Sequence, residues 1–122
     1  MNKLLKFTAL LETATGVTVL ALPHIAVRLL FAADVSSAGV LMTRFAGICL
    51  IALGVACWTG RATVQQLSGM LTYNVLVVLY FAYVGIRGQA VGLLLWPAVV
   101  VHAVISVLLV RARSKEERTP AA

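Results

Sequence analysis

The feature that most constrains this chain is a set of four long apolar stretches. They run over about residues 4–22, 38–58, 67–86 and 91–110. A helix needs about 20 mostly apolar residues to cross the hydrocarbon core of a bilayer. In lipid every backbone N–H and C=O must be paired within the protein, and a helix achieves this inside a single segment. The sequence therefore predicts an all-α protein, a bundle of four transmembrane helices.

Composition supports a membrane protein over a soluble one. Of the 122 residues, 61% are hydrophobic and 11% are charged, whereas soluble domains have about 45–50% apolar and about 25% charged residues. The formal net charge of +6 comes from residues at the ends of the stretches, which favours contact with lipid headgroups over binding of nucleic acid. We expect one transmembrane domain over residues 1–112 and a charged cytoplasmic tail over residues 113–122.

The distribution of lysine and arginine predicts the orientation, because cytoplasmic loops of membrane proteins are enriched in both. On the far side of a four-span arrangement lie only Arg28 and Arg87. The side that holds both termini carries Lys3, Lys6, Arg61, Arg111, Arg113, Lys115 and Arg118. We therefore expect both termini in the cytoplasm and a multi-pass protein of a bacterial-type inner membrane. Its expected partners are the lipid bilayer and either other membrane subunits or further copies of itself.

Three local features add detail to the predicted spans. The first connection, residues 23–37, is long enough for a short interfacial helix, with Ser36 or Ser37 capping the second span. Gly47 and Gly54 mark a surface that another helix can approach closely. Pro97 is expected to kink the fourth span.

Each predicted span contains one polar residue that needs an explanation: Glu12, Arg44, Asn74 and His102. A charge near the centre of a membrane helix costs about 2.5–3.5 kcal/mol, so such residues usually face protein or water. One bundle can turn all four inward, and a Glu12–Arg44 pair with the other two nearby is the sharpest hypothesis. Further candidates for the lining of a pocket are Tyr73, Tyr80 and Ser106.

A structural role for these residues is the competing interpretation. Embedded polar residues often only hold helices together, with each hydrogen bond contributing about 0.6 kcal/mol. Asn74 and His102, each taken alone, fit that role. For Glu12 and Arg44 the two interpretations are equally weighted, since intramembrane ionisable residues are functional candidates by default.

Motifs of catalysis and metal binding are absent from the sequence. It contains no nucleophile elbow, glycine-rich phosphate loop or zinc-binding HExxH motif. Cys49 and Cys57 lie too far apart on one predicted helix for a disulfide. We therefore predict no catalytic residue and no metal ligand, and we lean against an enzyme.

The second span resembles that of the DoxX-like group of small four-helix membrane proteins. The similarity rests on chain length, an acid in the first span, and the motif Arg44-Phe-Ala-Gly47 followed by Leu53-Gly54. Some members of that group are linked to quinone-coupled oxidation of sulfur compounds, and others to assembly of membrane proteins. The resemblance implies the four-helix fold and a role for Glu12 and Arg44, and it makes a quinone one candidate cofactor.

The first span also resembles that of the small multidrug resistance transporters. In those proteins an acid in the first helix exchanges protons for a cationic drug, and Leu11-Glu12-Thr13-Ala14-Thr15-Gly16 is similar to that helix. The third span departs from that family's pattern, because it reads Leu71-Thr-Tyr-Asn-Val. A paired Arg44 would also compete with a cation for Glu12.

Three functional hypotheses follow from the sequence. The first is a non-catalytic accessory or assembly subunit of a membrane complex. The second is a DoxX-like protein that binds a quinone or lipid through Glu12, Arg44 and His102. The third is a small proton-coupled transporter that uses Glu12.

Overall fold

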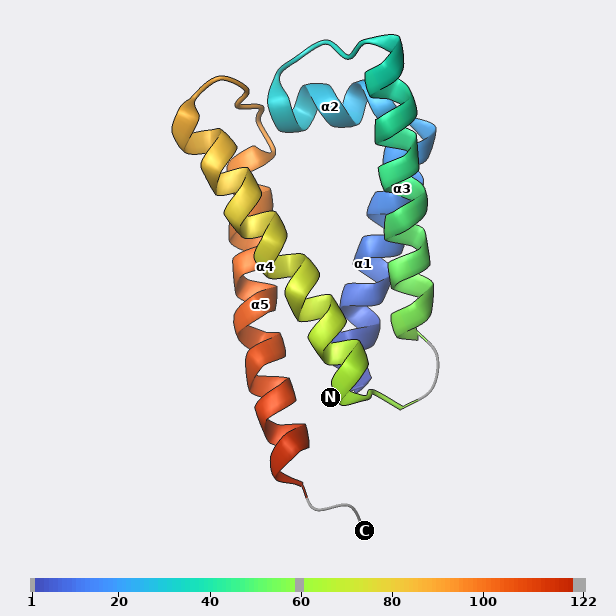
Figure 1. Ribbon diagram of the computed structural model, residues 1–122, viewed down its shortest axis with the longest axis vertical. Helices are drawn as coiled ribbons and strands as arrows, with labels where there is room; N and C mark the ends of the chain where they lie inside the picture. The colour runs from blue at the N-terminus through green and yellow to red at the C-terminus, as the bar shows by residue number, and fades with distance from the viewer. Residues whose placement is uncertain (1, 59–60, 120–122) are drawn as a thin grey trace.

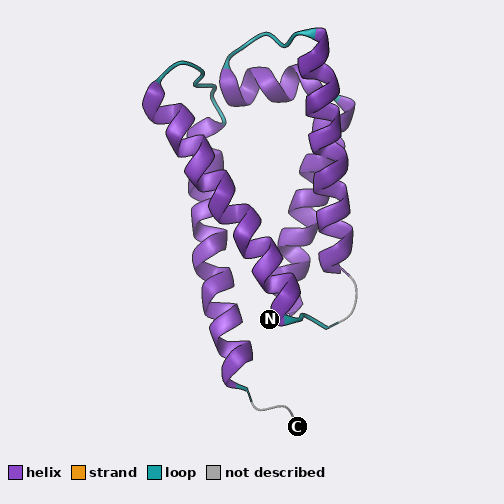
Figure 2. Cartoon of the chain, in the orientation of Figure 1, coloured by secondary structure: helices purple, strands orange, loops and turns teal. Residues whose placement is uncertain are grey.

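The computed structural model describes residues 2–58 and 61–119, which form five helices and, within those ranges, no strand (Figures 1 and 2). Four of the helices are long and apolar enough to cross a membrane. The prediction of an all-α chain with four long apolar helices is confirmed, and the fold is compatible with a multi-pass membrane protein. The helices are α1 (Asn2–Ala21), α2 (Pro23–Phe31), α3 (Ser37–Trp58), α4 (Val64–Arg87) and α5 (Leu95–Arg118).

Polar residues next to the apolar runs fix where several helices begin. The first connection contains the predicted short helix, α2, and Ser36 caps α3 by accepting a hydrogen bond from the Gly39 amide at 3.1 Å. Helix α4 begins at a capping box, in which the Gln66 amide donates to the Thr63 hydroxyl at 3.2 Å and the Thr63 amide donates to the Gln66 side chain at 3.1 Å. The box satisfies backbone donors that the first turn of a helix leaves free.

The last helix differs from its predicted bounds at both ends. Residues 91–94 are not helical, because the Gly92 and Leu94 amides donate to the carbonyls of Leu30 and Leu29 in α2 at 2.9 and 2.8 Å. Pro97 consequently lies in the first turn of α5. A proline there breaks no helical hydrogen bond, so the predicted kink has no cause. At its other end α5 continues through Arg118, so most of the predicted tail extends the helix.

The four long helices form two pairs, α1 with α3 and α4 with α5 (Figure 1). Backbone meets backbone in the first pair: a Cβ atom added to Gly47 would lie 2.7 Å from the carbonyl oxygen of Gly16. Gly54 lies against Ala9 and Thr13 of α1 in the same way. The prediction that Gly47 and Gly54 mark a close helix approach is confirmed, and the neighbour is α1.

The two pairs share a hydrophobic core near the end of the molecule where both termini lie, called here the terminal end. From there α1 and α4 diverge toward the far end, where α2 lies across the molecule (Figure 1). Both cysteines are free, as predicted. The buried core residues are Leu5, Ala9, Cys57, Leu67, Met70, Ile105, Leu109 and Ala112.

Candidate functional site

Three of the four predicted intramembrane polar residues come together, one each from α1, α4 and α5. Glu12 is 1% exposed, Asn74 is fully buried, and the His102 side chain is 14% exposed. The side chain of Tyr73, the neighbour of Asn74 in sequence, lies beside the Glu12 carboxylate. Its ring meets that of His102 edge to face, with 5.9 Å between the ring centroids. We call these four residues the Glu12 cluster.

Asn74 fixes the protonation pattern of the His102 ring. Its side-chain amide donates to the Met70 carbonyl at 2.8 Å, so the amide oxygen is the atom that faces Nδ1 of His102, at 2.7 Å. That oxygen can only accept, and therefore Nδ1 carries a hydrogen and donates. In the neutral ring Nε2 is then an acceptor, with no hydrogen bond to any described residue.

Glu12 has a buried oxygen without a partner. Oε1 accepts no hydrogen bond from any residue in the described ranges. Nδ1 of His102 lies 4.0 Å away, which is too far for a hydrogen bond. An unsatisfied buried polar atom costs about 1–3 kcal/mol. Oε1 is therefore a buried acceptor whose hydrogen-bonding capacity is unused.

Arg44 lies apart from the cluster, and the predicted Glu12–Arg44 pair is wrong. Its side chain is exposed, and it makes no ion pair with any described residue. The reason is the packing of α3, which meets α1 through Gly47 and Gly54. Backbones in such close contact leave no room for a long side chain between them.

The remaining candidates divide between the cluster and the surface. Tyr73 belongs to the cluster. Tyr80 is exposed and lines a separate hollow near the far end. The Ser106 hydroxyl donates to the His102 carbonyl one turn earlier on α5, at 2.8 Å. The sequence predicted only that Tyr73 lines a pocket. Its place next to Asn74, one residue from the inward face of α4, was the signal that could have placed it in the cluster.

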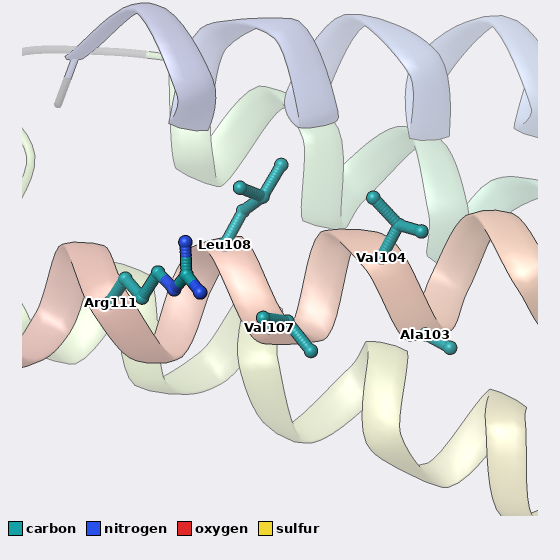
Figure 3. Close-up of a pocket in the computed structure, with 5 residues that line it drawn as sticks. All are labelled: Ala103, Val104, Val107, Leu108 and Arg111. Carbon is teal, nitrogen blue, oxygen red and sulfur yellow. The ribbon is translucent and has the colours of Figure 1, made fainter.

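A hollow of about 290 Å³ on α5 is unconnected with the cluster (Figure 3). Four apolar side chains and one arginine line it, all from α5, and no cluster residue is among them. The lining residues are Ala103, Val104, Val107, Leu108 and Arg111.

The hydrogen-bonding atoms of the Glu12 cluster determine what it can bind. No group of three or more histidine, cysteine, aspartate or glutamate side chains that could hold a metal ion occurs among residues 2–58 and 61–119. With Glu12 ionised, Oε1 of Glu12 and Nε2 of His102 are both acceptors, since the hydrogen on His102 Nδ1 is donated to Asn74. Protonation of Glu12 adds one donor.

Comparisons of the chain with protein-family models, with curated proteins and with solved structures find no match.

The Asn74–His102 hydrogen bond gives a first prediction. A double-mutant cycle of Asn74→Ala and His102→Ala, measured by unfolding in detergent, should give a coupling energy of about 0.6–1.7 kcal/mol, the range for buried membrane hydrogen bonds. The exposed Arg113–Glu117 pair is the control, with about 0.5 kcal/mol or less expected. A coupling no larger than that of the control would contradict the hydrogen bond.

Proposed function

We propose that this chain is a membrane protein that binds a cationic or hydroxyl-bearing amphiphile at Glu12 and exchanges a proton for it. The observation that carries the proposal is the buried oxygen of Glu12 without a partner. The proposal includes the orientation indicated by the lysines and arginines, with both termini in the cytoplasm of a bacterial-type inner membrane.

The hydrogen-bonding atoms of the Glu12 cluster favour a ligand that brings a positive charge or a hydrogen-bond donor. A quinone presents only carbonyl acceptors, and ionised Glu12 together with Nε2 of His102 offers it none of the donors it needs. A cation is attracted by the carboxylate, and the aromatic ring of Tyr73 beside it adds to that attraction. Protonated Glu12 does offer one donor, so quinone binding would take up a proton where cation binding releases one.

Exposure of Arg44 removes the main objection to a proton-coupled exporter. The sequence alone suggested that Arg44 neutralises Glu12, which would shut out a cationic substrate. Instead Glu12 has no basic residue beside it other than His102 among the described residues. A proton and a cation that compete for one carboxylate are the minimum that coupled exchange requires.

The architecture is also compatible with exchange between two sides of a membrane. The shared core of the two helix pairs lies toward the terminal end, and α2 lies across the far end (Figure 1). Movement of one pair against the other around the core would change which side has access to Glu12. This is the rigid-body type of motion that transporters use.

Tetraphenylphosphonium, a permanent lipophilic cation without an exchangeable proton, tests the proposal. The purified full chain in detergent should bind it saturably in calorimetry, and binding should weaken as the pH falls because protons compete for Glu12. Failure to bind at any pH would refute the proposal. A ubiquinone analogue that binds with proton uptake would instead support the DoxX-like alternative.

A second candidate function, an accessory subunit of a membrane complex, is favoured by Arg44. This residue is exposed on α3, about 10 Å along the helix from Ser37 at 1.5 Å per residue. A charge at that depth usually faces protein or water. A carboxylate of another membrane protein would satisfy it, and a second copy cannot supply one at this depth because its Glu12 is buried.

The Arg44 prediction concerns recovery of a partner. Purification from native membranes in mild detergent should yield a stoichiometric partner, and Arg44→Leu should lower its recovery about tenfold, the factor for losing about 1.4 kcal/mol. Arg61→Gln, which changes an exposed arginine outside the spans, is the matched control. A clean monomer or homodimer, or equal loss in both variants, would count against an accessory role.

A further inference from the structure

A second hollow lies near the far end, between α2 and the last turns of α4. Its volume is about 360 Å³. Its walls combine aromatic rings with one arginine and contain no acidic side chain. The lining residues are Phe31, Tyr80, Tyr83, Val84, Arg87, Gln89 and Ala90.

Aromatic contacts shape this hollow and position the Arg87 guanidinium that lines it. The ring of Phe31 meets that of Phe81 edge to face, with centroids 5.6 Å apart, which fixes the end of α2 against α4. The Arg87 guanidinium lies over the ring of Tyr83, 5.9 Å from its centroid. Tyr80 and Tyr83 are 60% and 58% exposed, as expected for tyrosines at the boundary between hydrocarbon and headgroups.

The positive charge of Arg87 is uncompensated. It has no carboxylate partner among the described residues, whereas Arg28 at the same end pairs with Asp34 at 2.8 Å. The chain has four acidic residues. Glu12 is buried, Asp34 is paired, and Glu116 and Glu117 belong to the last turns of α5 at the terminal end. A second copy in the same orientation therefore brings no free carboxylate to Arg87.

We propose that this hollow binds an anionic phospholipid of the leaflet at the far end. The lipid phosphate lies on the Arg87 guanidinium, a fork of donors that matches phosphate oxygens. Gln89 at the mouth donates to the headgroup, and an acyl chain runs along Tyr80 and Val84 toward the membrane centre. The site is distinct from Glu12, so either proposal can fail without the other.

Fluorescence of Trp96 can report on this site. A Cβ atom added to Gly85 would lie 2.6 Å from the Trp96 ring, so that ring packs on the face of α4 opposite the hollow, about one helix diameter of 10 Å away from it. In a Trp58→Phe background, phosphatidylglycerol with brominated acyl chains should quench Trp96 at a concentration at least fivefold lower than brominated phosphatidylcholine does. An attraction of about 1 kcal/mol per basic residue at a membrane surface corresponds to about that factor.

Matched variants distinguish binding of the lipid in the hollow from a general attraction of anionic lipid to positive charge. Arg87→Gln should abolish the preference for phosphatidylglycerol, Arg87→Lys should retain part of it, and Arg28→Gln should leave it unchanged. Tyr80→Ala, which keeps every charge, should weaken quenching by both lipids. An unchanged preference in Arg87→Gln would overturn the proposal, and so would an equal loss in Arg28→Gln.

Discussion

Replacing Glu12 with glutamine is expected to weaken binding of tetraphenylphosphonium at least about 100-fold, which corresponds to about 2.7 kcal/mol. The amide keeps the size of the side chain but carries no charge to attract the cation. In a low-dielectric site that attraction is much stronger than in water. Calorimetry of both proteins in the same detergent measures the difference.

Two further substitutions show whether the loss in Glu12→Gln is specific to the carboxylate. Glu12→Asp keeps the charge one methylene group further back and should bind about tenfold more weakly than the wild type. Glu117→Gln removes an exposed carboxylate from α5 and should bind like the wild type. Similar affinities of Glu12→Gln and the wild type would remove Glu12 from the binding site.

Replacing Gly47 with leucine is expected to lower the free energy of unfolding by about 3 kcal/mol, the upper end for overpacking a core. The added Cβ atom would lie 2.7 Å from the Gly16 carbonyl oxygen and 2.8 Å from the Leu20 amide nitrogen. Both atoms belong to the backbone of α1, which cannot turn aside as a side chain can. Helices α1 and α3 must therefore separate.

Gly69→Leu is the matched control for the glycine prediction. A Cβ atom at Gly69 would meet nothing within 4 Å, and leucine is a better helix former than glycine by roughly 1 kcal/mol. Thermal unfolding in detergent should therefore show a marked loss in Gly47→Leu and none in Gly69→Leu. Equal stability of the two variants would contradict the close contact of α1 with α3.

The sequence was sufficient to predict the four long helices, because length and hydropathy within one segment determine them. It also predicted that Glu12, Asn74 and His102 face one interior, since the period of a helix relates each residue to its own apolar face. The sequence could not predict which residues lie beside Glu12. Periodicity indicates which face of a helix is polar but not which helix lies against that face. Because α3 contacts α1 through Gly47 and Gly16, Arg44 does not lie beside Glu12.

The start of α5 was missed for a related reason. Residues 91–94 are apolar enough to continue the fourth span, but the amides of Gly92 and Leu94 pair with carbonyls of α2. Contacts between segments far apart in sequence leave no trace in local hydropathy. The position of Tyr73 beside Glu12 was missed likewise, because it depends on how α4 is rotated against α1.

The exchange of a proton for a cation at Glu12 is tested most directly by counting the protons released when the cation binds. Tetraphenylphosphonium is added to the purified protein in weakly buffered detergent with a pH-sensitive dye, at a pH where Glu12 is protonated in the free protein. Because this cation has no proton to lose, any released proton comes from the protein. Each bound cation should release about one proton from the wild type and none from Glu12→Gln. Cation binding without proton release at every pH, or release that persists in Glu12→Gln, would contradict this exchange.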